Sequence, residues 1–161
     1  MAYGNFKNVE EVAQKFDIEV AKKSVFVQQK EFEVQEVLFL LITENLWDDL
    51  SFINETTICE KIISPVLNIV AKKYDQLNVW SHVRDNFDEG WTQALAEMVA
   101  SSLTGASLCY GVVTTGKTWE FGKLEHDTFT VDPVAVSAAD NLQKTLNILN
   151  WMFERVAQLD V

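Results

Sequence analysis

The sequence of 161 residues is 48% hydrophobic, which is enough for one domain with a buried core and marginal for two. Its 24 acidic and 13 basic residues give a net charge of -11, which argues against tight binding to DNA or RNA, since such binding needs lysine and arginine to neutralise phosphates. No apolar stretch is long enough to cross a bilayer and the N-terminal residues lack a secretory signal pattern, so we expect a soluble cytoplasmic protein.

We expect a single domain over residues 1–161 that opens with a helical region at 1–54. Asn8 is placed to cap a helix at Val9–Phe16, and residues 20–27 have the composition of an edge strand. Residues 31–50 carry apolar side chains at helical spacing, which predicts one buried helix face. That face contains Val34, Val37, Leu38, Leu41, Ile42 and Leu46, extended by Trp47 and Leu50.

The next helix is predicted to begin near Thr57, because Thr57 and Glu60 have the spacing of a capping box. Pro65 lies inside this segment, where it removes a backbone hydrogen bond and should kink or divide the helix. The predicted buried stripe contains Ile58, Ile62, Val66, Ile69 and Val70.

A strand at residues 77–83 leads directly into a helix at residues 85–103. Asp85 has the residue type and place of an N-cap, and Gly105 is a stop signal just beyond the helix end. The predicted inward face of this helix contains Phe87, Trp91, Leu95, Met98 and Val99.

The C-terminal third predicts a hairpin followed by a helix. Residues 107–114 and 118–124 read as paired strands around a turn at 115–117, and residues 128–131 as a short third strand. Ser137 and Asp140 have capping-box spacing at the start of a helix predicted over residues 137–159. Its inward residues would be Leu142, Leu146, Leu149, Phe153 and Val156.

Three passages occur in an order that resembles a PD-(D/E)xK nuclease-like family of bacterial and cyanobacterial proteins. They are CEKIISPVL at 59–67, GWTQALAEM at 90–98 and YGVVTTGKTWEF at 110–121. The resemblance covers about residues 55–124 and implies a reduced restriction-endonuclease-like α+β fold with a small mixed sheet flanked by helices. Residues 55–132 would then be the nuclease-like remnant and residues 133–161 a C-terminal helix.

The resemblance also implies which catalytic residues to look for. Such nucleases use an entry-helix glutamate, a strand aspartate and a Glu-x-Lys, because clustered carboxylates hold Mg²⁺ while the lysine helps to activate water. Glu60 matches the entry-helix glutamate, and Gln93 matches a glutamine often found on the following helix. Nothing matches the aspartate or the Glu-x-Lys, because the chain passes from Val83 through Arg84 directly into the next helix. We therefore expect no catalysis and no resident metal or cofactor.

Acidic residues at the start of the 85–103 helix offer an alternative. Asp85, Asp88 and Glu89 lie within about one turn and could join Glu60 and Gln93 in a rearranged Mg²⁺ site. The interpretation we favour is structural: Asp85 caps the helix, the other two acids stabilise its first turn, and Glu60 completes its own capping box.

Loss of the catalytic strands would leave an unpaired sheet edge, which is a template for pairing with another chain. We expect either a homo-oligomer covering the 77–83 strand or an intramolecular rearrangement that places this strand beside residues 107–114. The predicted function is a non-catalytic interaction or oligomerising protein, whose acidic surface favours a protein partner. The alternatives are a metal-dependent nuclease with a rearranged carboxylate site and a purely structural oligomeric subunit.

Overall fold

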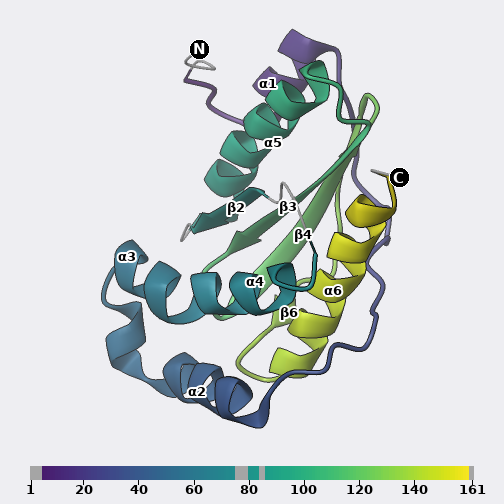
Figure 1. The fold of residues 1–161 in the computed structure, drawn as a ribbon. Helices are drawn as coiled ribbons and strands as arrows, with labels where there is room; N and C mark the ends of the chain where they lie inside the picture. Colours follow the sequence, from purple (N-terminus) through teal and green to yellow (C-terminus); the bar gives the residue numbers. More distant parts are fainter. Residues whose placement is uncertain (1–4, 75–79, 84–85, 160–161) are drawn as a thin grey trace. The chain divides into compact units, whose positions relative to one another are not determined.

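The computed structural model describes residues 5–74, 80–83 and 86–159 and has a mixed α+β fold (Figure 1). The chain divides into two compact units, each assembled from separate parts of the sequence. Unit 1 contains Met1–Phe26, Asn78–Thr114 and Glu120–Ala135, and unit 2 contains Val27–Leu77, Thr115–Trp119 and Val136–Val161. Within the described ranges, no helix combines the length and the apolar character that crossing a bilayer requires.

Unit 1 combines two helices with a mixed sheet. Asn8 caps α1 by accepting a hydrogen bond from the Glu11 backbone N at 2.9 Å, as predicted. The elements of the unit are α1 Val9–Phe16, β1 Glu19–Ala21, β2 Trp80–Val83, α5 Phe87–Leu103, β3 Leu108–Thr114, β4 Thr118–Glu125 and β5 Thr128–Val131, the first two residues of β4 belonging to unit 2.

The strands follow the order β1-β5-β4-β3-β2. β1 is parallel to β5, β5 is antiparallel to β4, and β2 is parallel to β3, with Trp80 opposite Gly111. The structure confirms that β3 and β4 are neighbours joined by the turn at residues 115–117. It also confirms the predicted third strand, β5. β1 lies at the sheet edge as expected but is shorter than the predicted strand at 20–27.

The junction after β2 shows how the chain uses the predicted 77–83 strand. Residues 77–79, Arg84 and Asp85 lie outside the described residues, whereas Trp80–Val83 is a strand paired with β3. β2, α5 and β3 thus form a parallel strand-helix-strand unit. The intramolecular alternative, in which this strand lies beside residues 107–114, is confirmed.

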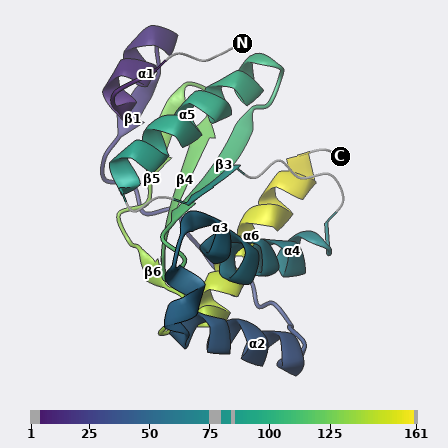
Figure 2. The same ribbon diagram turned by 90° about the vertical axis from the view of Figure 1, so that its left-hand side faces the viewer.

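The core of unit 1 lies between the helices and one face of the sheet. α5 runs along this face and packs on β3, with α1 beside it (Figure 2). The predicted inward residues of α5 are buried, except that Phe87 is only partly covered. The helix ends at Leu103, and Gly105 follows with a φ of 113°, which fits the predicted stop signal.

Two glycines let the Trp91 indole approach the sheet closely. A Cβ at Gly122 would lie 2.6 Å from Trp91 Cη2, and a Cβ at Gly111 would lie 3.0 Å from Met98 Sδ and 3.2 Å from Trp91 Cζ3. The ring also contacts Phe129, at a centroid distance of 5.9 Å. Glycine at these strand positions is therefore explained by the space that the indole occupies.

Unit 2 is mainly helical. The hairpin turn packs on its first helices, because Lys117 Nζ lies 4.5 Å from the Phe52 ring centroid and a Cβ at Gly116 would lie 2.8 Å from Ile58 Cγ2. β6 pairs antiparallel with the start of β4, and α4 packs on α6. The elements are α2 Glu36–Trp47, η1 Asp49–Phe52, α3 Glu55–Ile58, η2 Cys59–Ile63, α4 Ser64–Ala71, β6 Val136–Ser137 and α6 Leu142–Leu159.

The helix predicted to begin near Thr57 starts earlier than expected. Asn54 is the cap, since its Oδ1 accepts from the Thr57 backbone N at 2.9 Å, so the predicted capping box of Thr57 and Glu60 is wrong. The division expected at Pro65 is confirmed: a π-helical turn, η2, ends at Ile63, and Pro65 lies in the first turn of α4. The predicted stripe is buried except for the half-buried Ile69.

The last helix begins later than predicted. Ser137 belongs to β6, and α6 starts at Leu142 after Asn141, whose side chain accepts from the Lys144 backbone N at 3.0 Å. Ser137 Oγ still accepts from the Asp140 backbone N at 3.3 Å, but this contact shapes the turn that precedes the helix. The predicted inward residues of α6 are buried, apart from the half-buried Val156.

Candidate functional site

The acidic start of α5 is built around an asparagine. Asn86 Oδ1 accepts from the backbone N of Asp88 at 3.0 Å and of Glu89 at 3.5 Å, so Asn86 is the cap and the assignment of Asp85 as the cap is wrong. Asp85 itself lies outside the described residues. Asp88 and Glu89 occupy the first turn as predicted, where the helix dipole favours negative charge.

One carboxyl group near this turn was missed by the sequence interpretation. Glu120 on β4 accepts a hydrogen bond from Trp91 Nε1 at 2.7 Å. Burial raises the pKa of Glu120, the Trp91 bond partly opposes that rise, and the charge of Asp88 adds to it. The alternation of buried Trp119 and Phe121 indicates that Glu120 points to the opposite side of the strand, but only the tertiary contact with Trp91 reveals its burial.

Replacement of Glu120 by glutamine should stabilise the protein at neutral pH, because the amide oxygen can still accept from Trp91 without the cost of burying a charge. A carboxyl with a raised folded-state pKa favours the folded state when protonated, so the wild type gains stability as pH falls through that pKa. The difference in thermal midpoint between Glu120→Gln and wild type should therefore be largest near pH 7.5 and shrink toward pH 4.5. Glu19→Gln in the same sheet is the control, and an equal difference at both pH values would contradict the assignment.

The other predicted site residues are distributed over both units. Glu60 is exposed on η2 of unit 2, whereas Asp88, Glu89 and Gln93 belong to α5 of unit 1. Gln93 is half-buried and has a polar partner. In the described part of the chain, no three histidine, cysteine, aspartate or glutamate side chains gather as ligands for a metal ion. Asp88 and Glu120 are therefore two carboxyl groups that do not belong to a larger cluster of potential metal ligands among the described residues.

A different surface stands out in unit 2, on α2. This helix spans only part of the predicted 31–50 segment and buries Ile42 and Leu46. Val37 and Trp47, which were expected to be buried with them, are 76% and 65% exposed, so the prediction of one buried face is wrong. We call the open side the α2 face. It consists of Val37, Leu40, Leu41, Trp47, Leu50 and Ile53, each more than half exposed.

The α2 face is unusual in both size and position. Its six side chains are each more than half exposed, and exposed apolar patches of roughly 300–600 Å² on monomers are often functional. α2 is apolar on its buried and on its open side, a pattern typical of a helix covered all round. The open side therefore has the properties of a contact surface.

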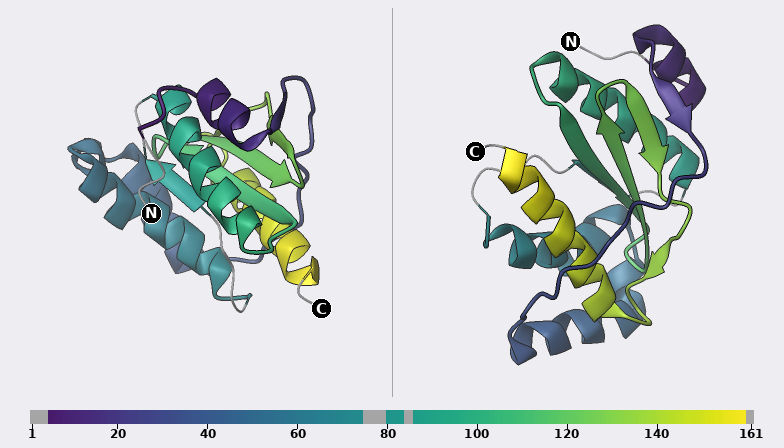
Figure 3. Two further views of the ribbon diagram at one scale, coloured as in Figure 1. Left: turned by 90° about the horizontal axis from the view of Figure 1, so that it is seen from above. Right: turned by 90° about the vertical axis from the view of Figure 1, so that its right-hand side faces the viewer.

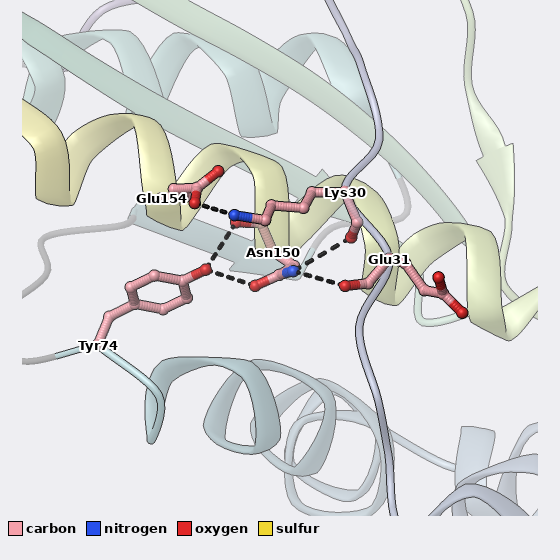
Figure 4. A network of polar contacts seen from close by, with 5 residues as sticks. All are labelled: Lys30, Glu31, Tyr74, Asn150 and Glu154. Carbon is pink, nitrogen blue, oxygen red and sulfur yellow. Dashed lines mark hydrogen bonds and ion pairs between the residues drawn. The ribbon is translucent and has the colours of Figure 1, made fainter.

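An extended segment just before α2 is attached to α6, within unit 2. We call residues 27–35 the strap; it runs past α6 as extended chain (Figure 3). The buried Asn150 donates to Lys30 O and Glu31 O, both at 3.1 Å, and its Oδ1 accepts from Tyr74 Oη at 2.5 Å (Figure 4). Lys30 also forms an ion pair with Glu154, which raises the pKa of Lys30.

Two further α6 side chains continue this attachment. Asn147 Oδ1 accepts from the Phe32 backbone N at 3.0 Å, and Gln143 Nε2 donates to Phe32 O at 2.8 Å. Backbone groups of Lys30, Glu31 and Phe32 are thus held by side-chain amides that recur every three or four residues along α6. Such a fixed strap positions the beginning of α2.

Neither a family model, nor a curated protein, nor a solved structure matches this chain. Its functional interpretation therefore depends on the surfaces and contacts described above.

Proposed function

We propose that this chain is a non-catalytic interaction protein that binds a protein partner through the α2 face. The observation that carries the proposal is the row of exposed apolar side chains from Val37 to Ile53. A standard interface takes roughly 800 Å² from each partner, and the α2 face would form its apolar centre. The sequence adds support, since it lacks the aspartate and the Glu-x-Lys that a nuclease of the resembled family would need.

Substitution of two central residues of the α2 face should abolish partner binding without unfolding the protein. Leu41→Ser combined with Trp47→Ser removes apolar surface that is already exposed, so we expect unchanged unfolding and loss of the partner in affinity capture from the native host. Leu103→Ser is the control, because Leu103 is at least as exposed as Leu41 and Trp47 but lies in unit 1. Recovery of the same partner by wild type and both variants would refute the proposal.

A metal-dependent nuclease is the alternative function. The observation that favours it is that Glu120 accepts from Trp91, which lies one helical turn after Asp88 on α5, because paired carboxylates attract divalent cations. Cleavage of DNA or RNA that depends on Mg²⁺ or Mn²⁺, and that is lost in both Asp88→Ala and Glu120→Ala, would establish this alternative. Lack of cleavage together with partner binding through the α2 face would support the interaction protein.

Self-association through the sheet is the other alternative, as in a purely structural subunit. β2 is the end strand of the sheet order and pairs with β3 on one side, so its other side is where a second copy would add a strand. Light scattering at micromolar concentration separates the cases. A monodisperse monomer excludes this homo-oligomer, whereas a dimer that persists in the Leu41→Ser, Trp47→Ser variant would place the contact away from the α2 face.

A further inference from the structure

The charge around the α2 face indicates what kind of partner it fits. Between residues 31 and 60 the chain has eight acidic residues and no lysine, arginine or histidine. All of these acids are exposed except Asp48, which is partly covered and caps Leu50 N at 3.0 Å. They are Glu31, Glu33, Glu36, Glu44, Asp48, Asp49, Glu55 and Glu60.

Several acids lie directly among the apolar side chains. Glu44 is three or four residues from Leu40, Leu41 and Trp47, so it shares their side of α2. Glu36 lies one turn before Leu40 in the first turn of the helix, and Asp49 begins η1 just after Trp47. Along α2 the face is therefore an apolar strip bordered and interrupted by negative charge, and Lys117 lies near its η1 end, over the Phe52 ring.

From this arrangement we infer that the α2 face binds a basic amphipathic helix of a partner protein. The inference rests on the proposed function and specifies the partner. Leucine-like side chains of the incoming helix would cover the apolar strip, and lysine or arginine side chains would lay their stems along it with their charges near Glu36, Glu44 and Asp49. α2 has 12 residues, about 18 Å, which matches some three turns of a partner helix.

The same charges disfavour other occupants. A second copy on this face would bring Glu36, Glu44 and Asp49 of two chains together, and like charges across an interface are repulsive. Anionic lipid surfaces and nucleic-acid phosphates carry the same sign and are repelled as well. A basic protein segment satisfies both the apolar strip and its acidic border.

Fluorescence anisotropy with three synthetic peptides of about 18 residues tests the inference. The first is an amphipathic helix of leucine and lysine, the second replaces every lysine by glutamate, and the third is a shuffled leucine and lysine sequence without amphipathic spacing. We expect the first to bind at least tenfold more tightly than the other two. Equal binding of the shuffled peptide would reduce the effect to general charge attraction and overturn the inference.

Two sets of variants assign the binding to this surface. The first set combines Glu36→Gln, Glu44→Gln and Asp49→Asn. It should lower the affinity for the basic peptide at least tenfold and reduce the salt dependence of binding. The control Glu10→Gln, Glu19→Gln and Asp140→Asn makes the same change in net charge at exposed positions elsewhere and should leave binding unchanged. Equal losses in both sets would overturn the inference.

The outcomes also separate this inference from the proposed function. If the acidic peptide binds as well as the basic one, and Leu41→Ser with Trp47→Ser abolishes both, the α2 face is a binding surface but its partner is not basic. If the face variant leaves binding of every peptide unchanged, and also leaves capture of the host partner unchanged, the proposed function fails with the inference.

Discussion

Asn150→Ala should destabilise the protein by about 3 kcal/mol, the largest effect that we expect from a single polar substitution. The substitution removes the donors to Lys30 O and Glu31 O, and it removes the Oδ1 acceptor of Tyr74 Oη, which can still donate to the Asn150 backbone carbonyl at 3.3 Å. Each buried polar group that loses its partner costs about 1–3 kcal/mol. The expected fall in thermal midpoint is roughly 6–12 °C for a chain of this size.

The measurement is urea unfolding followed by circular dichroism, with Asn68→Ala as the control. Asn68 is exposed on α4 of the same unit, and alanine there should be neutral or slightly stabilising because of its helix propensity. Partner binding provides a second readout, since loosening the strap should also disturb the start of α2. A decrease in the free energy of unfolding of less than about 1 kcal/mol would mean that water replaces the hydrogen bonds of the Asn150 amide.

Gly122→Ala should cost about 3 kcal/mol through overpacking. The added Cβ would lie 2.6 Å and 2.7 Å from two atoms of the Trp91 ring and 3.2 Å from Thr130 O, which is backbone. The Trp91 ring cannot easily move away, because its Nε1 donates a hydrogen bond to Glu120 at 2.7 Å and the ring is packed in the core. Inserting a methyl group into such a site typically costs 1–3 kcal/mol.

A matched glycine and a double substitution make this prediction specific. Gly111→Ala should cost about 1 kcal/mol, since its nearest contact is the sulfur of Met98, a flexible side chain that can move. Trp91→Phe removes the two clashing ring atoms, so it should relieve much of the cost of Gly122→Ala in the double variant. Additive effects in this cycle would show that the clash with Trp91 is not the cause.

The sequence predicted best those elements whose signals are local. The cap of α1 at Asn8, the hairpin around residues 115–117 and the stop at Gly105 each depend on a few neighbouring residues. The starts of α3 and α6 were misplaced because two competing caps lie three or four residues apart. Asn54 precedes Thr57 by three residues, and Asn141 follows Ser137 by four, so the tertiary packing decides between them.

The face of α2 could not be predicted because apolar residues surround the helix. Helical spacing identifies a buried side only when the other side is polar. On α2 the exposed Leu41 and the buried Ile42 are both apolar, so the spacing does not distinguish their sides. The same limit applies to Glu120, whose pKa is raised by burial in the tertiary structure and whose hydrogen-bond donor Trp91 lies 29 residues earlier in the chain. The first-turn acids Asp88 and Glu89 were predictable because their environment is the helix itself.

The division of the chain into two units determines how the protein can be dissected. Each unit is made of three stretches that alternate along the sequence, and β4 contributes residues to both. Because neither unit is continuous in sequence, a fragment that holds all of one unit also holds part of the other, and neither unit can be produced alone as a continuous fragment. Deletion mapping would report misfolding in place of binding, and surface substitutions in the intact chain are the suitable means of mapping a partner.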